Sequence, residues 1–528
     1  MFWADRIVEE ILETEAAKSA TKESPLIIRD EKTLSGRVHV GSMRGVAIHG
    51  LISEVLNERG IPNRFLWEHN DFDPFDTIPG YLDEAKYREH LGKPLYTVPS
   101  PETGYDNYAQ FYAAEFAAVH VKTGFFPEYY WTHKDLYAAG KMDEYIRIAL
   151  ERRDDVRRIL KEVSGSVKDE SWLPVSIVCE ACGKIMTTRG HDWDGETVGY
   201  ICDRSPDGTV PCGHTGRTSP FKGGSKLFWK VDWAAKWNAM HVDVEGGGKD
   251  HSTKGGARDV SNHISRELFK REGPYDVPYE FFLVGGKKMS SSKGKGSTAQ
   301  DMSDLFPPEI FRLILLGKDI NQQIDVDPSG DSVPRMYDWH DDLAEKVREG
   351  VADDFTRLYA LTKLPEDQAE ERALWHLRFS LVSFLVQMPH LDLYTEAEAA
   401  KGSPLTDDER AVLTLRAEYA KFWLTTYAPD SYKYVLQQSM PEGFTLTESQ
   451  KAALTKLHDY MKEAPRTGEE LHQRLHELKS EVPIEPKALF SAIYGLFLGR
   501  TSGPKAGWFL SVLPREYALQ QLAAAIAS

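Results

Sequence analysis

A strand, a glycine turn, a helix and a second strand follow one another near the start of the chain. Residues 25–28 form a short apolar run suited to a buried strand. From residue 43 to residue 59 apolar side chains recur at helical spacing, and Gly60 and Pro62 end that helix. Residues 64–67 predict the next strand. This βαβ unit predicts a parallel sheet that binds its ligands at the carboxyl ends of the strands.

The rest of the sequence falls into segments of different pattern. Residues 80–165 are mostly helical by periodicity, and a segment rich in Gly, Asp and Thr follows at 165–222. The apolar runs 227–231 and 279–284 predict that the sheet resumes there. Beyond Pro307-Pro308 the pattern is helical. Two apolar stripes there are interpreted as core: Leu374, Leu377, Leu381, Leu385 and Met388, and Val412, Leu415, Tyr419, Phe422 and Trp423.

Composition excludes several classes of protein. With 41% hydrophobic and 27% charged residues, and no apolar run of roughly 18 residues, the 528-residue chain suits a soluble protein of several domains without a membrane span. A net charge of −17 argues against a broad nucleic-acid-binding surface, although a local basic groove stays compatible because charges are screened beyond about 10 Å. The start of the chain is an acidic amphipathic helix rather than a signal or transit peptide, so we expect the cytoplasm.

The turn after the first strand has the residues of an anion site. The backbone turns at Gly36, and His39, Gly41 and Ser42 lead into the helix start. Free N–H groups and the positive dipole end at a helix start favour a phosphate. His39 supplies a further donor, and Gly41 lets a nucleotide approach the backbone closely.

A second basic segment lies far downstream. Lys287, Lys288, Lys293 and Lys295 occur in a Gly/Ser-rich loop, which suits a loop that closes on a triphosphate and stabilises charge developing in the transition state. The loop residues expected to contact the nucleotide are Met289, Ser290, Ser291 and Ser292. Together the two segments predict a site that holds ATP while its α-phosphate is attacked, which is the chemistry of carboxylate adenylation.

Residues 246–251 predict a strand-end turn on the same sheet edge. Gly248 permits close approach of a ligand to the backbone, and Asp250 is suited to accept hydrogen bonds from ribose hydroxyls. The alternative interpretation is a glycine hairpin with a solvated aspartate.

Both loops resemble signatures of a known family. The first is similar to the HIGH signature of class I aminoacyl-tRNA synthetases, and residues 288–294 are similar to their KMSKS loop. The resemblance is most specific to class I lysyl-tRNA synthetases, the archaeal and minority-bacterial form. The further segments that carry it are Trp3-Ala4-Asp5, the SGxxHxG form of the first loop, Val231-Asp232-Trp233 and residues 248–256. It covers roughly residues 1–330, and the helical remainder fits by architecture alone.

The resemblance implies an α/β Rossmann-like fold and a domain order. It implies a catalytic domain at 1–300, with a helical insertion at 80–165 and a zinc-binding insertion at 165–222. A connecting helical segment at 301–345 and an all-α anticodon-binding domain at 346–528 follow.

It also implies a reaction, in which ATP and Mg²⁺ activate lysine to lysyl-adenylate and the lysyl group passes to the 3′ end of tRNA(Lys), with tRNA bound before activation. His39, Lys288 and Lys293 are the catalytic residues under this hypothesis. The same enzyme class acting on glutamate or arginine, or a tRNA-binding paralogue without catalysis, are the alternatives. The sequence leaves the oligomeric state open, and a monomer is compatible with it.

The chain also departs from the family pattern. Ser42 replaces the usual second histidine of the first signature, and Ser291 stands where KMSKS has its second lysine, which leaves Lys293 as the substitute. Glu31 stands where the family often has Gly, and Leu34 where it has Pro.

A lysine substrate needs a carboxylate for its ε-ammonium and an apolar wall for its methylenes. Asp71 and Asp73 follow the second strand and are the candidates for that carboxylate. The positions that match family residues lining the amino-acid site are Thr33, Trp233, His251 and Tyr279.

Four cysteines predict a metal site rather than a disulfide framework. Cys179 and Cys182 form a strong CxxC half-site, and Cys202 and Cys212 form a wider second pair. Four thiolates complete a tetrahedral Zn²⁺ site of structural type, with His191 or His214 as possible replacements for one of them.

Overall fold

The computed structural model describes residues 1–287, 297–364, 374–388, 391–441 and 443–528. At its centre lies a five-stranded sheet in the order β10-β9-β1-β2-β3, in which every neighbouring pair is parallel. The strands are β1 (Leu26–Thr33), β2 (Asn63–Asn70), β3 (Glu128–Trp131), β9 (Val244–Gly248) and β10 (Tyr275–Tyr279). Helix α3 (Met43–Glu58) connects β1 to β2, so the predicted βαβ unit is confirmed.

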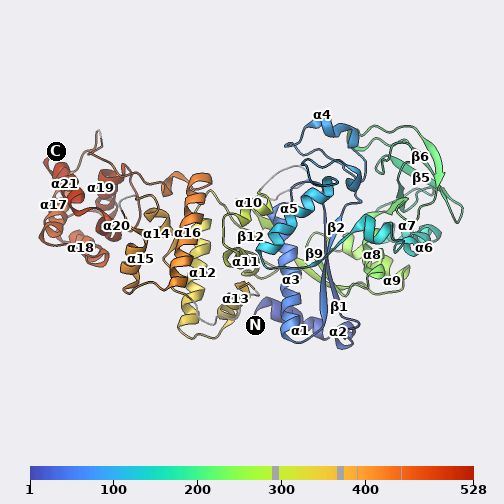
Figure 1. Ribbon diagram of the computed structural model, residues 1–528, viewed down its shortest axis with the longest axis horizontal. Coiled ribbons are helices and arrows are strands. Elements are labelled where there is room, and N and C mark those ends of the chain that lie inside the picture. Colours follow the sequence, from blue (N-terminus) through green and yellow to red (C-terminus); the bar gives the residue numbers. More distant parts are fainter. Residues whose placement is uncertain (288–296, 365–373, 389–390, 442) are drawn as a thin grey trace. The chain divides into compact units, whose positions relative to one another are not determined.

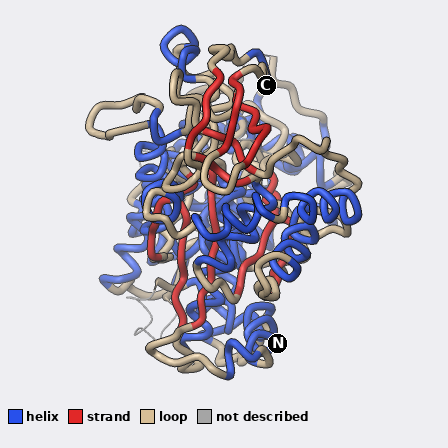
Figure 2. Tube along the Cα trace, turned by 90° about the vertical axis from the view of Figure 1, so that its right-hand side faces the viewer, coloured by secondary structure: helices blue, strands red, loops and turns tan. Residues whose placement is uncertain are grey.

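Helices cover both faces of this sheet, as Figures 1 and 2 show. Successive side chains of a strand point to opposite faces. On one face Asp30 of β1 lies beside His49 of α3, whose Nε2 accepts a hydrogen bond from Gly246 N at 2.8 Å. On the other face Glu31 meets Lys236 of α8 (Trp229–Ala239). Strand β1 is therefore buried on both sides, as expected for the middle of a parallel sheet.

Residues Met1–Val326 and Val351–Glu371 form one compact body, here called unit 1. Its other helices are α1 (Trp3–Leu12), α2 (Glu15–Lys18), α4 (Glu84–Tyr87), α5 (Tyr108–Lys122), α6 (Asp143–Glu151), α7 (Arg153–Ser164), α9 (Ala257–Glu267), α10 (Ala299–Ser303), α11 (Pro308–Leu316) and α13 (Asp354–Thr362). Its shorter strands are β4 (Val175–Ile177), β5 (Thr188–Trp193), β6 (Val198–Cys202), β7 (Thr215–Thr218), β8 (Ser225–Leu227), β11 (Phe282–Leu283) and β12 (Ile324–Asp325). Strands β5, β6 and β7 form an antiparallel sheet within the cysteine-bearing segment.

Three sequence predictions for unit 1 need correction. The run 227–231 does not continue the main sheet, because β8 ends at Leu227 and pairs with β4, and α8 begins at Trp229. The tryptophans at 229, 233 and 237 follow helical spacing, which the strand interpretation overlooked. Within the segment predicted to be mostly helical, β3 supplies the fifth strand of the sheet. The last predicted strand is split between β10 and β11.

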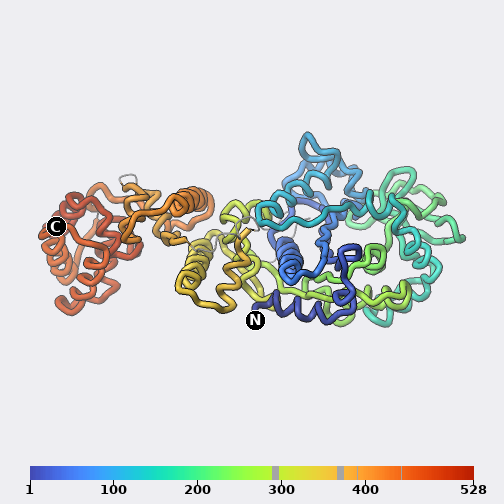
Figure 3. The backbone as a smooth tube through the Cα atoms, turned by 60° about the horizontal axis from the view of Figure 1, so that its bottom comes forward, coloured from blue at the N-terminus to red at the C-terminus, as the bar shows by residue number. Residues whose placement is uncertain are grey.

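Unit 2 comprises Asp327–Gly350 and Arg372–Ser528. It is helical in its described residues, and Figure 3 traces its orange and red part as coils and loops. Its helices are α12 (Ser332–Arg348), α14 (Phe379–Leu385), α15 (Leu393–Lys401), α16 (Asp407–Thr426), α17 (Glu448–Glu463), α18 (Gly468–Glu481), α19 (Pro486–Leu498), α20 (Ala506–Val512) and α21 (Arg515–Ala527). In the described parts of the chain we find no helix that combines the length and the apolar character of a membrane span.

The two apolar stripes predicted for this region are only partly right. Leu374 and Leu377 precede α14, so the first stripe does not lie on one helix. On α16, Leu415 and Phe422 are 41% and 40% exposed, and the buried apolar side chains are Leu413, Ala417, Ala420, Trp423 and Leu424. Apolar residues occupy two sides of this helix, so helical spacing alone selected the wrong one.

Candidate active site

A pocket of about 370 Å³ opens where β1, β9 and β10 end. This is the edge at which parallel α/β sheets bind ligands. Its lining residues are Asp30, Glu31, Lys32, Thr33, His39, Gly41, Ser42, Arg44, Trp67, Trp229, Trp233, Glu245, Gly246, Gly247, Gly248, Asp250, His251, Tyr279, Glu280, Phe281 and Phe282.

The loop that contains His39, Gly41 and Ser42 forms one side of this pocket. His39 precedes a short 3-10 turn (Val40–Ser42) that runs into α3, and His39, Gly41 and Ser42 all line the cavity. Gly36 lies outside the lining and has a φ of 154°, a backbone conformation that favours glycine.

The segment that follows the second sequence loop lies against the first loop. Val40 N donates to Ser297 O at 3.2 Å, and Ala299 N donates to Val38 O at 2.8 Å. The predicted loop residues Lys288, Met289, Ser290, Ser291, Ser292 and Lys293 lie outside the described residues. The described end of that loop therefore meets the pocket side that contains His39.

The glycine run at the end of β9 forms the pocket wall beside the first loop. A Cβ added at Gly246 would lie 2.1 Å from the backbone oxygen of Val277, so the close pairing of β9 with β10 requires glycine there. Gly248 and Asp250 both line the cavity, and Asp250 is exposed.

Aromatic side chains form the other side. The rings of Trp229 and Trp233 are 6.0 Å apart and nearly parallel, and the ring of His251 lies edge-on at 5.9 and 6.0 Å from them. Thr33 and Tyr279 line the same cavity, and burial raises the pKa of Tyr279 well above its ordinary value. Such a wall suits the methylene chain of a long amino acid.

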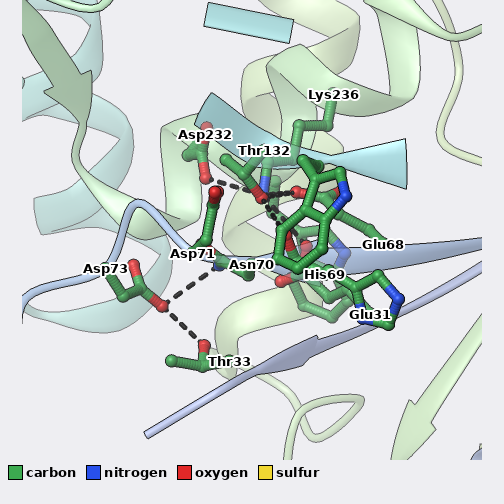
Figure 4. Close-up of polar contacts among 12 residues, drawn as sticks. Glu31, Thr33, Glu68, His69, Asn70, Asp71, Asp73, Thr132, Asp232 and Lys236 are labelled. Atoms are coloured by element: carbon green, nitrogen blue, oxygen red, sulfur yellow. Dashed lines mark hydrogen bonds and ion pairs between the residues drawn. The ribbon is translucent and has the colours of Figure 1, made fainter. Parts of the chain in front are cut away.

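The structure places Asp71 and Asp73 behind the wall of the pocket. Asp73 accepts hydrogen bonds from Thr33 Oγ1 at 2.6 Å and Asn70 Nδ2 at 3.1 Å (Figure 4). It also pairs with Lys226. Asp71 accepts a hydrogen bond from His133 N at 2.8 Å, and burial raises its pKa to about 6. Neither side chain belongs to the lining of the cavity.

Sequence reasoning missed a buried charge network beneath the pocket. Arg29 donates to both oxygens of Glu245 at 2.7 and 2.8 Å, and also pairs with Glu68 and Glu31. Lys236 adds contacts to Glu68 at 2.5 Å and Glu31 at 3.0 Å. Although burial opposes ionisation, Lys236 and Arg29 hold the pKa of Glu68 well below its usual range. The signal in the sequence was the charged run 29–32 directly after an apolar strand.

The four cysteines come together in the insertion. The Sγ atoms of Cys179 and Cys212 are 3.6 Å apart, and those of Cys182 and Cys202 are 3.9 Å apart. Tetrahedral Zn–S bonds of about 2.3 Å require sulfur atoms about 3.8 Å apart, so the thiols fit such a site. All four lie within 4.8 Å of one another, and neither His191 nor His214 belongs to this group.

Comparison with known proteins agrees with the geometry. The family model described as "tRNA synthetases class I (K)" matches residues 1–379. Lysine–tRNA ligase 1 of Methanosarcina acetivorans is 33% identical over 98% of this chain and 97% of its own. Lysine–tRNA ligase of Archaeoglobus fulgidus is 32% identical over the whole of both chains. A glutamate tRNA ligase structure from Elizabethkingia meningosepticum, in complex with its amino acid, has a TM-score of 0.39 and 11% identity, covering 95% of this chain and 99% of that one.

The family match spans well over half of the chain and includes every lining residue of the pocket. The resemblance deduced from the two loops is thereby confirmed. The chain belongs to the class I (K) family of tRNA synthetases.

Proposed function

We propose that the protein is a lysine–tRNA ligase, which activates lysine with ATP and transfers it to tRNA(Lys) at this pocket. The observation that carries the proposal is the meeting of the first loop with Ser297 and Ala299 at a cavity whose other side is aromatic. A phosphate-binding side and an amino-acid-binding side are what the formation of an aminoacyl-adenylate needs. The family match and the full-length relatives named as lysine–tRNA ligases support lysine as the amino acid.

In the first step the lysine carboxylate attacks the α-phosphorus of ATP. A carboxylate O–P bond forms, the bond to the bridging α–β oxygen breaks, and pyrophosphate leaves. His39 lies at a helix start, where N–H groups and the helix dipole stabilise phosphate charge. We assign Lys288 and Lys293 to the phosphates and Asp250 to the ribose. The substrate supplies the nucleophile, so the protein contributes positioning and electrostatic stabilisation.

Mg²⁺ is the implied metal of this step. It would bind largely through substrate phosphates and water together with one or two carboxylates, and Glu280 supplies a carboxylate in the lining of the pocket. When bound it neutralises charge on the departing pyrophosphate.

In the second step a ribose hydroxyl of the terminal adenosine of tRNA attacks the carbonyl carbon of lysyl-adenylate, and AMP leaves. We propose the domain order 1–300 for catalysis, 301–345 for connection and 346–528 for anticodon binding. The cytoplasm is the proposed compartment.

The test is lysine-dependent exchange of pyrophosphate into ATP, measured with and without tRNA(Lys), together with aminoacylation. Exchange with lysine and charging of tRNA(Lys) are expected. If glutamate or arginine supports exchange instead, the substrate assignment is wrong. Tight tRNA binding without exchange for any amino acid would support a paralogue that has lost catalysis.

We also propose that the four thiolates hold a structural Zn²⁺ that ties together the insertion. Loop-rich insertions of this kind gain stability from the metal. Metal analysis of the purified protein should give one zinc per chain, and Cys179→Ser should lower that content. Replacement by Co²⁺ should add thiolate charge-transfer absorption, and a spectrum lacking those bands would contradict the site.

A further inference from the structure

The charge network below the pocket contains more carboxylates than cations. Its connected cations are Arg29, Lys226 and Lys236, and its connected carboxylates are Glu31, Glu68, Asp73, Asp232 and Glu245. Five carboxylates thus share three cations. The neighbouring Arg258 does not close the gap, because its guanidinium has its own carboxylate, Asp276, at 3.5 Å.

The excess of negative charge is concentrated where two strands pair. Glu31 of β1 and Glu68 of β2 are directly opposite one another in the parallel register. Like charges in such positions repel. Glu68 is fully buried, whereas the side chain of Glu31 is 31% exposed. Between these two carboxylates, only Glu31 is accessible to a solute that enters the pocket.

Two other carboxylates of the network, those of Glu245 and Asp232, already have hydrogen-bond and ion-pair partners. Both oxygens of Glu245 accept hydrogen bonds from Arg29 and one each from the indole N–H of Trp233, at 2.7 Å, and of Trp237, at 3.0 Å. Asp232 accepts from Tyr137 Oη at 2.6 Å and lies 3.1 Å from Lys236. These groups have the partners that burial of a charge demands.

In the described part of the chain, Glu31 has partners at only one of its two carboxylate oxygens. Arg29 and Lys236 both approach its Oε2, and its Oε1 has no partner among the described residues. Burial raises the pKa of this carboxyl against the attraction of Lys236 and Arg29, with Glu68 and Glu245 adding to the increase. A further cation at Oε1 would give this oxygen a partner and would lower the raised pKa of the carboxyl.

The surroundings of Glu31 match a cation on an apolar stem. Glu31 and Thr33 lie on the same face of β1, two residues apart, and both line the pocket. Trp233 and His251 supply ring surface to the same cavity. An ammonium group at the end of a methylene chain would thus find a carboxylate at its tip and rings along its length.

We propose that Glu31 is the residue that selects the substrate, with its Oε1 accepting the side-chain ammonium of the amino acid. This inference rests on the proposed function, because it assigns the cation-binding group of the same site. The substrate then acts as the missing cation of the network. An amino acid with a carboxylate side chain would add to the excess and be rejected, and one with an uncharged side chain would leave Glu31 without its partner.

The experiment measures kcat and KM for lysine, arginine, glutamate and norleucine, the uncharged analogue of lysine, by pyrophosphate exchange in the presence of tRNA(Lys). Glu31→Gln keeps the shape and removes the charge. Loss of a charged partner predicts a KM for lysine at least about 30-fold higher, with the KM for ATP changed less than about threefold. The preference for lysine over norleucine should fall by a similar factor.

The matched control is Glu272→Gln, the same change at a 71% exposed side chain paired with Arg266, and it should leave both constants unchanged. Absence of lysine exchange in the unaltered protein would reject the proposed function itself. Normal exchange in that protein, together with an unchanged lysine KM and an unchanged preference over norleucine in Glu31→Gln, would overturn the role of Glu31 alone. If Glu31→Gln does not fold, Glu31→Asp decides: it keeps the charge but withdraws it by one methylene, so an unchanged lysine KM would equally overturn the assignment.

Discussion

Two buried charge clusters of this protein differ in their ratio of carboxylates to cations. In unit 1, Arg29 pairs with Glu31, Glu68 and Glu245, and Lys236 pairs with the first two of these. Glu31 and Glu245 also line the pocket. The second cluster, in unit 2, joins Asp341 of α12 to Arg416 of α16 and to His376.

The second cluster is closed. Asp341 receives both Nη1 of Arg416, at 3.0 Å, and Nη2, and His376 Nδ1 lies 2.9 Å from it. Arg416 also donates to Leu377 O at 3.0 Å. One carboxylate and one guanidinium neutralise one another here, whereas the cluster of unit 1 keeps an excess of carboxylates facing a cavity. We infer that the balanced cluster of unit 2 stabilises the fold. The excess of carboxylates beside the pocket of unit 1 instead favours binding of a cationic ligand.

The largest expected effect is that of Arg29→Met. This change removes the cation shared by the buried carboxylates of Glu68 and Glu245 and by the partly exposed Glu31, and removal of one partner from a single buried pair already costs about 3–5 kcal/mol. We expect a loss above about 5 kcal/mol in the stability of unit 1, measured by amide hydrogen exchange of β1 and β2 in increasing urea.

Arg64→Met is the matched control, because Arg64 pairs with Glu128 at the surface of the same sheet, with 49% and 53% of the side chains exposed. Its cost should stay below about 1 kcal/mol. Equal effects of the two variants would remove the distinction between buried and exposed pairs on which the comparison depends.

A double substitution tests whether the cluster of unit 2 is only structural. Asp341→Leu or Arg416→Met alone should destabilise α12 and α16 by about 3–5 kcal/mol, because each leaves the other charge buried and unpaired. The two together should recover most of that loss, since a balanced pair can be exchanged for apolar groups. Hydrogen exchange of α16 is the measurement, and a double variant no better than the single ones would give this cluster a role beyond packing.

The sequence predicted the parts of the fold that local periodicity encodes. The βαβ unit from β1 to β2 followed from apolar spacing and turn residues, and the first loop was recognised from its glycines and His39. Strand β1 was predicted only at residues 25–28, because Arg29, Asp30, Glu31 and Lys32 suggest solvent when viewed singly. Arg29 meets Glu245 across a sequence separation of 216 residues, and no local pattern reports such a pairing.

The candidate site likewise has residues that the sequence placed in the pocket and residues that it misplaced. Thr33, Trp233, His251 and Tyr279 line the pocket, as expected from family positions. Asp71 and Asp73 were chosen because they follow β2, but strand order cannot tell which side chains a neighbouring lysine already neutralises. Lys226 pairs with Asp73, and that contact depends on the packing of the insertion against β2.

The pH dependence of unit 2 should follow His376. Burial, and then the Arg416 cation, lower the pKa of His376 from its ordinary value of 6.5 to about 4. Between these two pH values the imidazole of His376 is therefore protonated in the unfolded chain and neutral in the folded chain. Stability is complete above about pH 6.5 and is lost as the pH falls to about 4, by about 3 kcal/mol. The exchange of α12 and α16 measured across that range should show this slope in the unaltered protein and lose it in His376→Gln, and a slope unaffected by the substitution would assign it to other groups.

The smallest expected effect is the response of each cluster to substrate. A ligand that binds only the folded state stabilises it by about 1.4 kcal/mol at ten times its dissociation constant. If Glu31 holds the ammonium group, lysine should slow the exchange of β1 and β2 by that amount, because it supplies the cation that the network of unit 1 lacks. Norleucine at the same concentration should not do so, since it fills the aromatic side of the pocket without the charge. The amides of α16 should respond to neither compound, because the carboxylate of Asp341 is already balanced by Arg416. Equal protection of β1 by lysine and norleucine would mean that binding comes from apolar contact alone, and that the excess of carboxylates has no part in recognition.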